Sequence, residues 1–92
     1  MPINVRIPTP LRKLTNEQDV IVANESGTLG QLIDALDRDF PGLKERLCDE
    51  RGELRRFVNV YVNGEDVRFL SGLQTAIASG AEVSIVPAVA GG

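Results

Sequence analysis

The 92-residue chain contains no histidine and a single cysteine, Cys48. Without histidine it lacks the commonest general base and zinc ligand. One cysteine cannot form an intrachain disulfide or a paired-cysteine redox or metal motif. Because no imidazole can activate Cys48, and because it follows a helical segment, we interpret it as a small packing residue. These absences predict no metal site and leave the chain little chemistry to perform on other molecules.

Long apolar runs are also missing. No stretch is long enough to cross a bilayer, which argues against a transmembrane span. The first ten residues, MPINVRIPTP, lack the apolar segment and small-residue cleavage site of a signal peptide. We therefore expect a cytoplasmic protein with no membrane partner.

A basic stripe of the kind that binds nucleic acid is absent as well. Ten basic and thirteen acidic side chains give a net charge of −3. The one cluster of basic residues is Arg51, Arg55 and Arg56, and acidic residues at 49, 50 and 53 interrupt it. We interpret this segment as a solvated loop of mixed charge rather than a phosphate-binding patch.

What remains is typical of a small globular protein. Hydrophobic residues make up 42% of the chain and charged residues 25%. At this length one modest core is expected. We predict a single domain over residues 1–92 with a flexible C-terminal tail over 87–92.

The first half of the sequence predicts a hairpin followed by a helix. Apolar and polar residues alternate over 3–7, and a second short strand is expected over 19–23 after two prolines and a polar turn at 13–18. Thr28 is a good N-cap for the helix that follows. Its apolar face repeats at spacings of three and four: Leu29, Leu32, Ile33, Leu36 and Phe40. Pro41 and Gly42 end it, and a short helical turn over 42–47 is expected next.

The second half predicts more strands. The strongest is 57–62, in which three valines, Val58, Val60 and Val62, face one way. Asn63 and Gly64 favour a type I′ turn. We expect a short strand over 67–69, a loop with a helical turn over 72–78, and a last strand over 82–86. The fold class is therefore α+β, with a mixed sheet packed on one main helix.

The sequence ends on a tail without charged or large side chains, Pro87-Ala88-Val89-Ala90-Gly91-Gly92. Its last two residues have no Cβ, so the tail could enter a narrow channel. One interpretation is a frayed terminus or a remnant of cloning. The other is that the carboxylate of Gly92 is the reactive group.

That carboxylate has a defined chemistry. With a pKa of about 3.3–3.7 it is an anion at neutral pH and a poor electrophile. An ATP-dependent partner could convert it to an acyl-adenylate, and sulfide or a persulfide could then displace the nucleotide. The product would be a thiocarboxylate, which is a better nucleophile than the carboxylate. No side chain of the protein itself is needed for these steps.

Two stretches carry a resemblance to a known family. RFVNVYVNGEDVRF (residues 56–69) and the segment from GL at 72–73 through VSIVPAVAGG resemble the β-grasp, ubiquitin-like sulfur carriers. These include the molybdopterin synthase small subunit and the thiamine sulfur carrier. The chain looks most like the carriers that deliver sulfide for cysteine biosynthesis. The resemblance matches the family's thiocarboxylated terminal glycine to Gly92 and its penultimate glycine to Gly91, next to Ala90.

The resemblance implies partners rather than an activity of the chain itself. It implies a ubiquitin-activating-enzyme-like adenylyltransferase with a sulfurtransferase domain, and a pyridoxal-phosphate cysteine synthase that accepts the sulfur. A metalloprotease that trims the cysteine adduct belongs to the same scheme. The chain would be a co-substrate of these enzymes, would not be an enzyme, and would bind no cofactor.

Three alternatives stay open. The chain could be a molybdopterin synthase small subunit, which would form a lasting complex with a large subunit. It could be a protein modifier joined through Gly92 to lysines of other proteins. It could also be an interaction domain whose tail has no chemistry.

A docking surface is predicted beside the tail. If the three valines of the central strand face the helix, Phe57 and Tyr61 lie on the opposite face, near Val86. Aromatic residues in such a patch are favoured anchors at interfaces. The alternative is that the loop over 41–56 folds over them.

Overall fold

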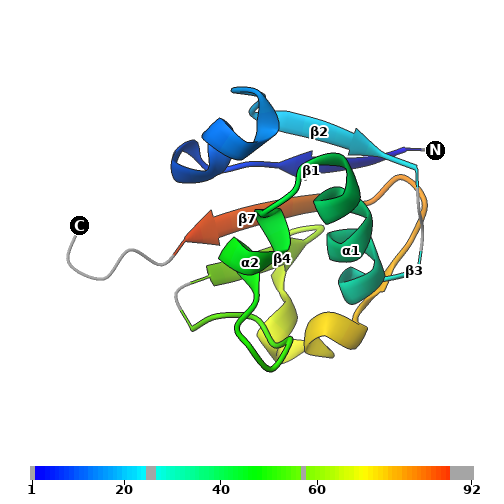
Figure 1. Cartoon of the computed structure of the whole chain (residues 1–92). Helices are drawn as coiled ribbons and strands as arrows, with labels where there is room; N and C mark the ends of the chain where they lie inside the picture. Colours follow the sequence, from blue (N-terminus) through cyan, green and yellow to red (C-terminus); the bar gives the residue numbers. More distant parts are fainter. Residues whose placement is uncertain (1, 25–26, 57, 88–92) are drawn as a thin grey trace.

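The computed structural model describes residues 2–24, 27–56 and 58–87. Within these, a five-stranded sheet is covered on one face by helices (Figure 1). The strands are β1 (Ile3–Arg6), β2 (Val20–Ala23), β3 (Gly27–Thr28), β4 (Val58–Val62), β5 (Glu65–Asp66), β6 (Ala76–Ile77) and β7 (Glu82–Pro87). The helices are α1 (Leu29–Asp39) and α2 (Leu43–Leu47), with short 3-10 helices η1 (Thr9–Thr15), η2 (Val67–Phe69) and η3 (Gly72–Gln74).

The main sheet is mixed, as predicted. Its strand order is β2-β1-β7-β4-β5. The first and last long strands, β1 and β7, run parallel in its centre, while β1–β2, β4–β5 and β4–β7 are antiparallel. A second, two-stranded sheet joins β3 to β6. Because β7 is paired on both sides, its course through the sheet is defined from Glu82 to Pro87.

Helix α1 begins where the sequence predicted it. The Thr28 hydroxyl accepts a hydrogen bond from the Gln31 N–H at 3.2 Å, and the Gln31 side chain accepts one from the Thr28 N–H at 2.9 Å. This reciprocal capping box satisfies two N–H groups that the helix itself cannot pair. Gly27 has a φ of 140°, and a Cβ there would meet Gln31 Oε1 at 2.2 Å, so only glycine leaves room for this cap.

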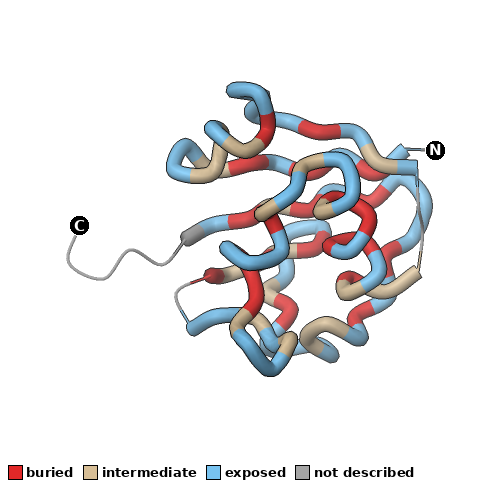
Figure 2. The backbone as a smooth tube through the Cα atoms, viewed as in Figure 1, coloured by how far each residue is buried: buried red, intermediate tan, exposed pale blue. Residues whose placement is uncertain are grey.

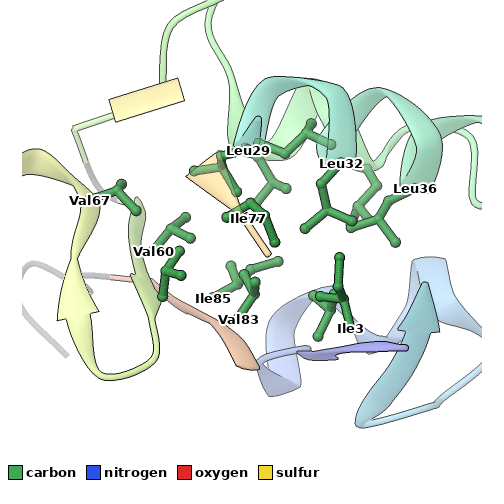
Figure 3. Packing of buried hydrophobic residues seen from close by; sticks show 14 of the residues in the cluster. Ile3, Leu29, Leu32, Leu36, Val60, Val67, Ile77, Val83 and Ile85 are labelled. Atoms are coloured by element: carbon green, nitrogen blue, oxygen red, sulfur yellow. The ribbon is translucent and has the colours of Figure 1, made fainter. Parts of the chain in front are cut away.

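The core lies between α1 and the sheet (Figure 3). Leu29, Leu32 and Leu36 of α1 point toward the valines and isoleucines of the sheet. In β4 the residues alternate, so that Val58, Val60 and Val62 are all buried, as predicted, and the residues between them are half-buried. The same alternation in β7 buries Val83 and Ile85. The helix face therefore determines which face of each strand is inside.

The segment after α1 lies on the same side of the sheet. Helix α2, predicted as a short helical turn, packs against α1 and η1 (Figure 1). Its Leu43 and Leu47 have no exposed surface. The loop beyond it closes through a bridge between Cys48 and Leu54. The interpretation that the loop over 41–56 folds onto the other face of the sheet is therefore not supported by its packing.

The turn at Asn63 and Gly64 is confirmed. Both residues have positive φ, 51° and 87°, as a type I′ turn requires. The strand that returns from this turn is Glu65–Asp66, so the prediction of a strand over 67–69 was wrong. Residues 67–69 form η2 instead, because the Asp66 carboxylate accepts the Arg68 N–H at 2.9 Å and turns the chain.

Two further expectations needed correction. The polar turn expected over 13–18 is shorter than predicted: 13–15 are the end of η1, which begins at Thr9 because Pro10 fits the first turn of a helix, and the turn itself is at 16–17. The segment over 72–78 does contain the expected helical turn, η3, but Ala76–Ile77 is a strand that pairs with Gly27–Thr28. In the described part of the chain, no helix is both long enough and apolar enough to cross a membrane.

Candidate functional site

The face of the sheet that turns away from α1 is the candidate site. We call it the open face. Figure 2 shows that buried residues alternate with more exposed ones along the strands of the sheet. The strand registers place one row across it, in which Arg6 lies between Val20 and Ser84, and Ser84 lies opposite Tyr61. The open face thus mixes polar and apolar side chains.

Two of the three residues predicted for docking lie together on this face. Tyr61 is half-buried and pairs with Ser84, whereas Val86 is 43% exposed and pairs with Asn59. Tyr61 and Val86 are therefore diagonal neighbours on adjacent strands, within reach of a long aromatic side chain. The third residue, Phe57, lies outside the described residues.

The predicted reactive end also lies outside the described residues. Ala90, Gly91 and Gly92 follow the end of β7 at Pro87. The structure does place the point from which they depart. Pro87 is paired in register with Val58 of β4, one position beyond the pair of Asn59 and Val86 on the open face. The C-terminal segment therefore starts beside the predicted docking residues.

Exposed apolar residues in and after η2 were not identified from the sequence. Phe69 is 88% exposed and Leu70 is 43% exposed. Both follow Val67, which is fully buried and anchors η2. Phe69 falls in the strand predicted over 67–69, from which its exposure could not be inferred, because alternating apolar residues also describe a half-buried strand.

Cys48 is a packing residue, as interpreted from the sequence. It caps the C-terminal end of α2, is 4% exposed and forms no disulfide. Burial raises the pKa of the Cys48 thiol, although the nearby Lys44 opposes this effect. A raised pKa leaves the thiol protonated at neutral pH, and only the thiolate is a strong nucleophile. Cys48 therefore lacks the environment of a sulfur-accepting cysteine.

The charged loop is a solvated structure of mixed sign. Arg51 lies 3.7 Å from an Asp49 oxygen and 3.6 Å from a Glu53 oxygen. Hydrogen bonds from the backbone N–H groups of Glu53 and Arg51 lower the pKa of the Asp49 carboxyl. Residues 2–24, 27–56 and 58–87 contain no group of three or more histidine, cysteine or acidic side chains suited to a metal ion. The polar side chains of this loop therefore interact with one another and with the backbone of the loop.

Comparisons with known proteins agree with the fold described above. The ThiS family model matches residues 5–92. The sulfur carrier protein CysO of Mycobacterium tuberculosis is 52% identical over 94 residues, with 100% of both chains covered. Its crystal structure superposes with a TM-score of 0.89 at 50% identity and covers 95% of this chain and 99% of that one.

Two further relatives broaden the comparison. A chain in the crystal structure of the Amycolatopsis orientalis BexX/CysO complex is 43% identical, covers 98% of this chain and 99% of that chain, and has a TM-score of 0.91. Small archaeal modifier protein 3 of Haloferax volcanii is 32% identical over 93 residues, again with both chains fully covered. The chain therefore belongs to the ThiS family and is a ubiquitin-like β-grasp protein of the sulfur-carrier kind.

Proposed function

We propose that this protein carries sulfur as a thiocarboxylate on Gly92 and delivers it for cysteine biosynthesis. The observation that carries the proposal is the full-length match to the sulfur carrier CysO, together with a family model that matches through residue 92. The position of Pro87 supports it, because Pro87 follows Val86 of the open face directly and a partner that docks there would lie beside the start of the tail.

The loading step consumes one ATP. A carboxylate oxygen of Gly92 attacks the α-phosphate of ATP, and pyrophosphate leaves. With sulfide as the donor, the sulfur attacks the acyl carbon of the adenylate, the bond from that carbon to the AMP oxygen breaks, and AMP leaves. The products are AMP and a thiocarboxylate, so neither an oxidant nor a reductant is needed.

The catalysts for these steps are partner proteins. The proposal assigns activation to a ubiquitin-activating-enzyme-like adenylyltransferase with a sulfurtransferase domain. It assigns sulfur acceptance to a pyridoxal-phosphate cysteine synthase, and removal of the resulting cysteine adduct to a metalloprotease. The chain acts as their co-substrate. Its cytoplasmic location stays a prediction from the sequence.

The docking residues are proposed on the open face. Tyr61 and Val86 would contact the activating enzyme and the cysteine synthase in turn, together with Phe57. Tyrosine is a frequent anchor at interfaces because it has a large rigid ring and a polar tip. Since both partners would use one surface, they should compete for the carrier.

Intact-mass spectrometry tests the chemistry. Incubation with the activating enzyme, ATP and sulfide should raise the mass of the protein by sulfur minus oxygen, in the C-terminal fragment. Deletion of Gly92, or Gly91→Phe, should abolish the shift while the circular dichroism and melting temperature stay unchanged. Cys48→Ala is the matched control and should load normally. A shift that maps to Cys48, or loading of the truncated chain, would refute the proposed site.

A second function is favoured by one relative. The Haloferax protein is named as a modifier, and it too is aligned over its full length. If this chain were a modifier, protein from its native host would include conjugates in which Gly92 is joined to lysines. Peptide mapping after denaturing purification would reveal such conjugates. Their absence, with a thiocarboxylate present, supports the carrier function.

A further inference from the structure

The turn that leads into β4 presents several backbone acceptors to one side chain. The Val58 N–H donates to the Arg55 carbonyl at 3.0 Å and closes the turn. Nη2 of Arg68 carries two N–H groups and lies within hydrogen-bond distance of three carbonyl oxygens, those of Arg55 at 2.8 Å, Arg56 at 3.1 Å and Val58 at 2.9 Å, so at least one N–H is shared. Nη1 of Arg68 donates to Asn59 Oδ1 at 2.6 Å. One guanidinium thus contacts four acceptors around the start of the strand.

The backbone around Arg68 is itself anchored. The Asp66 carboxylate accepts the Arg68 N–H at 2.9 Å, and the preceding residue, Val67, is fully buried. The Leu70 N–H closes η2 by donating to the Val67 carbonyl at 3.0 Å. Arg68 therefore connects an anchored helical turn to the start of β4, ten residues back in the chain.

The position of this connection relates it to the tail. Val58 is the residue of β4 that pairs with Pro87, and Asn59 pairs with Val86. Two of the four residues that Arg68 binds are therefore the strand partners of the last two residues of β7. Any movement of the 55–58 turn would move the point at which residue 88 begins.

We propose that Arg68 is a positioning residue for activation of the C-terminal carboxylate. It holds the end of the β4–β7 ladder, and thereby the point from which the tail departs relative to the docked sheet. This inference rests on the proposed function. The five residues beyond Pro87 can span at most about 17 Å when extended, so the carboxylate reaches the nucleotide only if the point where the tail departs is held within that distance.

A lysine could not do the same. Arginine presents several N–H donors in a fixed planar fork, which allows the carbonyls and the Asn59 amide to be bound together. A lysine ammonium has the same charge but is a single point, and it could not reach these acceptors at once. The comparison of Arg68→Lys with Arg68→Ala therefore separates geometry from charge.

Steady-state kinetics of activation test the inference. The measurement is pyrophosphate release by the adenylyltransferase with ATP, at varied concentrations of the full-length chain. In Arg68→Ala and Arg68→Lys, kcat should fall by about tenfold or more, since misplacement of a reacting group by about 1 Å can cost a hundredfold. KM for the carrier should change little, because the docking residues remain. Arg51→Ala is the matched control, since Arg51 is an exposed arginine whose contacts lie within its own loop.

The alternatives predict different results. A purely structural arginine would lower the melting temperature but leave kcat and KM unchanged below it. An arginine that touches the enzyme would raise KM at constant kcat. Full activity of Arg68→Lys would mean that charge alone suffices. Each of these results would overturn the positioning role, and if Arg68→Ala does not fold, the lysine variant decides. If the wild-type chain itself releases no pyrophosphate, the proposed function fails first.

Discussion

Both faces of the sheet carry valines, but the two faces differ in what covers them. On the inner face, Val60 is 1% exposed and lies in the core beside Val67 and Ile85 (Figure 3). On the outer face, Val22 is 58% exposed and Val86 is 43% exposed. All three residues are valines, so residue type does not set the difference in exposure. What sets it is the register of the strands relative to the helix.

This contrast suggests that the two faces have different roles. The inner face contributes the apolar burial that stabilises the fold. The open face contributes little burial and is free to contact partners beside the origin of the tail. Changes on the two faces should therefore affect different measurements, and the predictions below test that separation from the largest expected effect to the smallest.

The largest effect should come from a valine on the inner face. Val60→Ala removes buried methyl groups and leaves a cavity, so it should lower the free energy of unfolding by about 2–3 kcal/mol. The matched change on the outer face, Val22→Ala, should stay within about 0.5 kcal/mol. Urea denaturation of both variants measures the difference. Equal losses in the two variants would mean that the outer face is also covered.

Tyr61→Ala should affect binding more than stability. Loss of an aromatic anchor should weaken binding to the activating enzyme and to the cysteine synthase by about 1–2 kcal/mol, which is a factor of about 5–30 in Kd. Asn4→Ala is the control, because Asn4 pairs with Glu82 at the start of β7, the end far from the tail. Isothermal titrations that show wild-type affinity for Tyr61→Ala would place docking on another surface.

Thr28→Ala tests the N-cap of α1, the helix that covers the inner face. The change removes the hydroxyl that accepts the Gln31 N–H, so the free energy of unfolding should fall by about 1 kcal/mol. Thr28→Ser keeps the oxygen and should restore most of this loss. Thermal denaturation compares the three proteins. A serine variant as unstable as the alanine variant would show that the cap is not the cause.

Phe69→Ser should have the smallest effect on stability. The ring is 88% exposed, so its removal should change the free energy of unfolding by no more than about 0.5 kcal/mol. The same denaturation experiments check this value. A loss of more than 1 kcal/mol would mean that the ring is packed in solution, and it would weaken the contrast between the covered and uncovered parts of the molecule.

Much of the fold follows from local sequence. The alternation of valines in β4, the positive-φ pair Asn63 and Gly64, and the threonine cap of α1 all act over a few residues, and all three were predicted. The candidate site was partly predictable for the same reason. Tyr61 had to lie on the face opposite the buried valines, because side chains alternate along a strand.

The tertiary structure alone decided the rest. Strands β3 and β6 have two residues each, too few to show a periodic pattern, and they exist only because they pair with each other across the chain. Similarly, the contacts of Arg68 with the carbonyls of the 55–58 turn join residues ten or more positions apart. The sequence by itself determined the longer elements, such as α1, β4 and β7, and which side chains they present. Only long-range pairing decided that β7 lies between β1 and β4, with its last residue beside the turn that Arg68 holds.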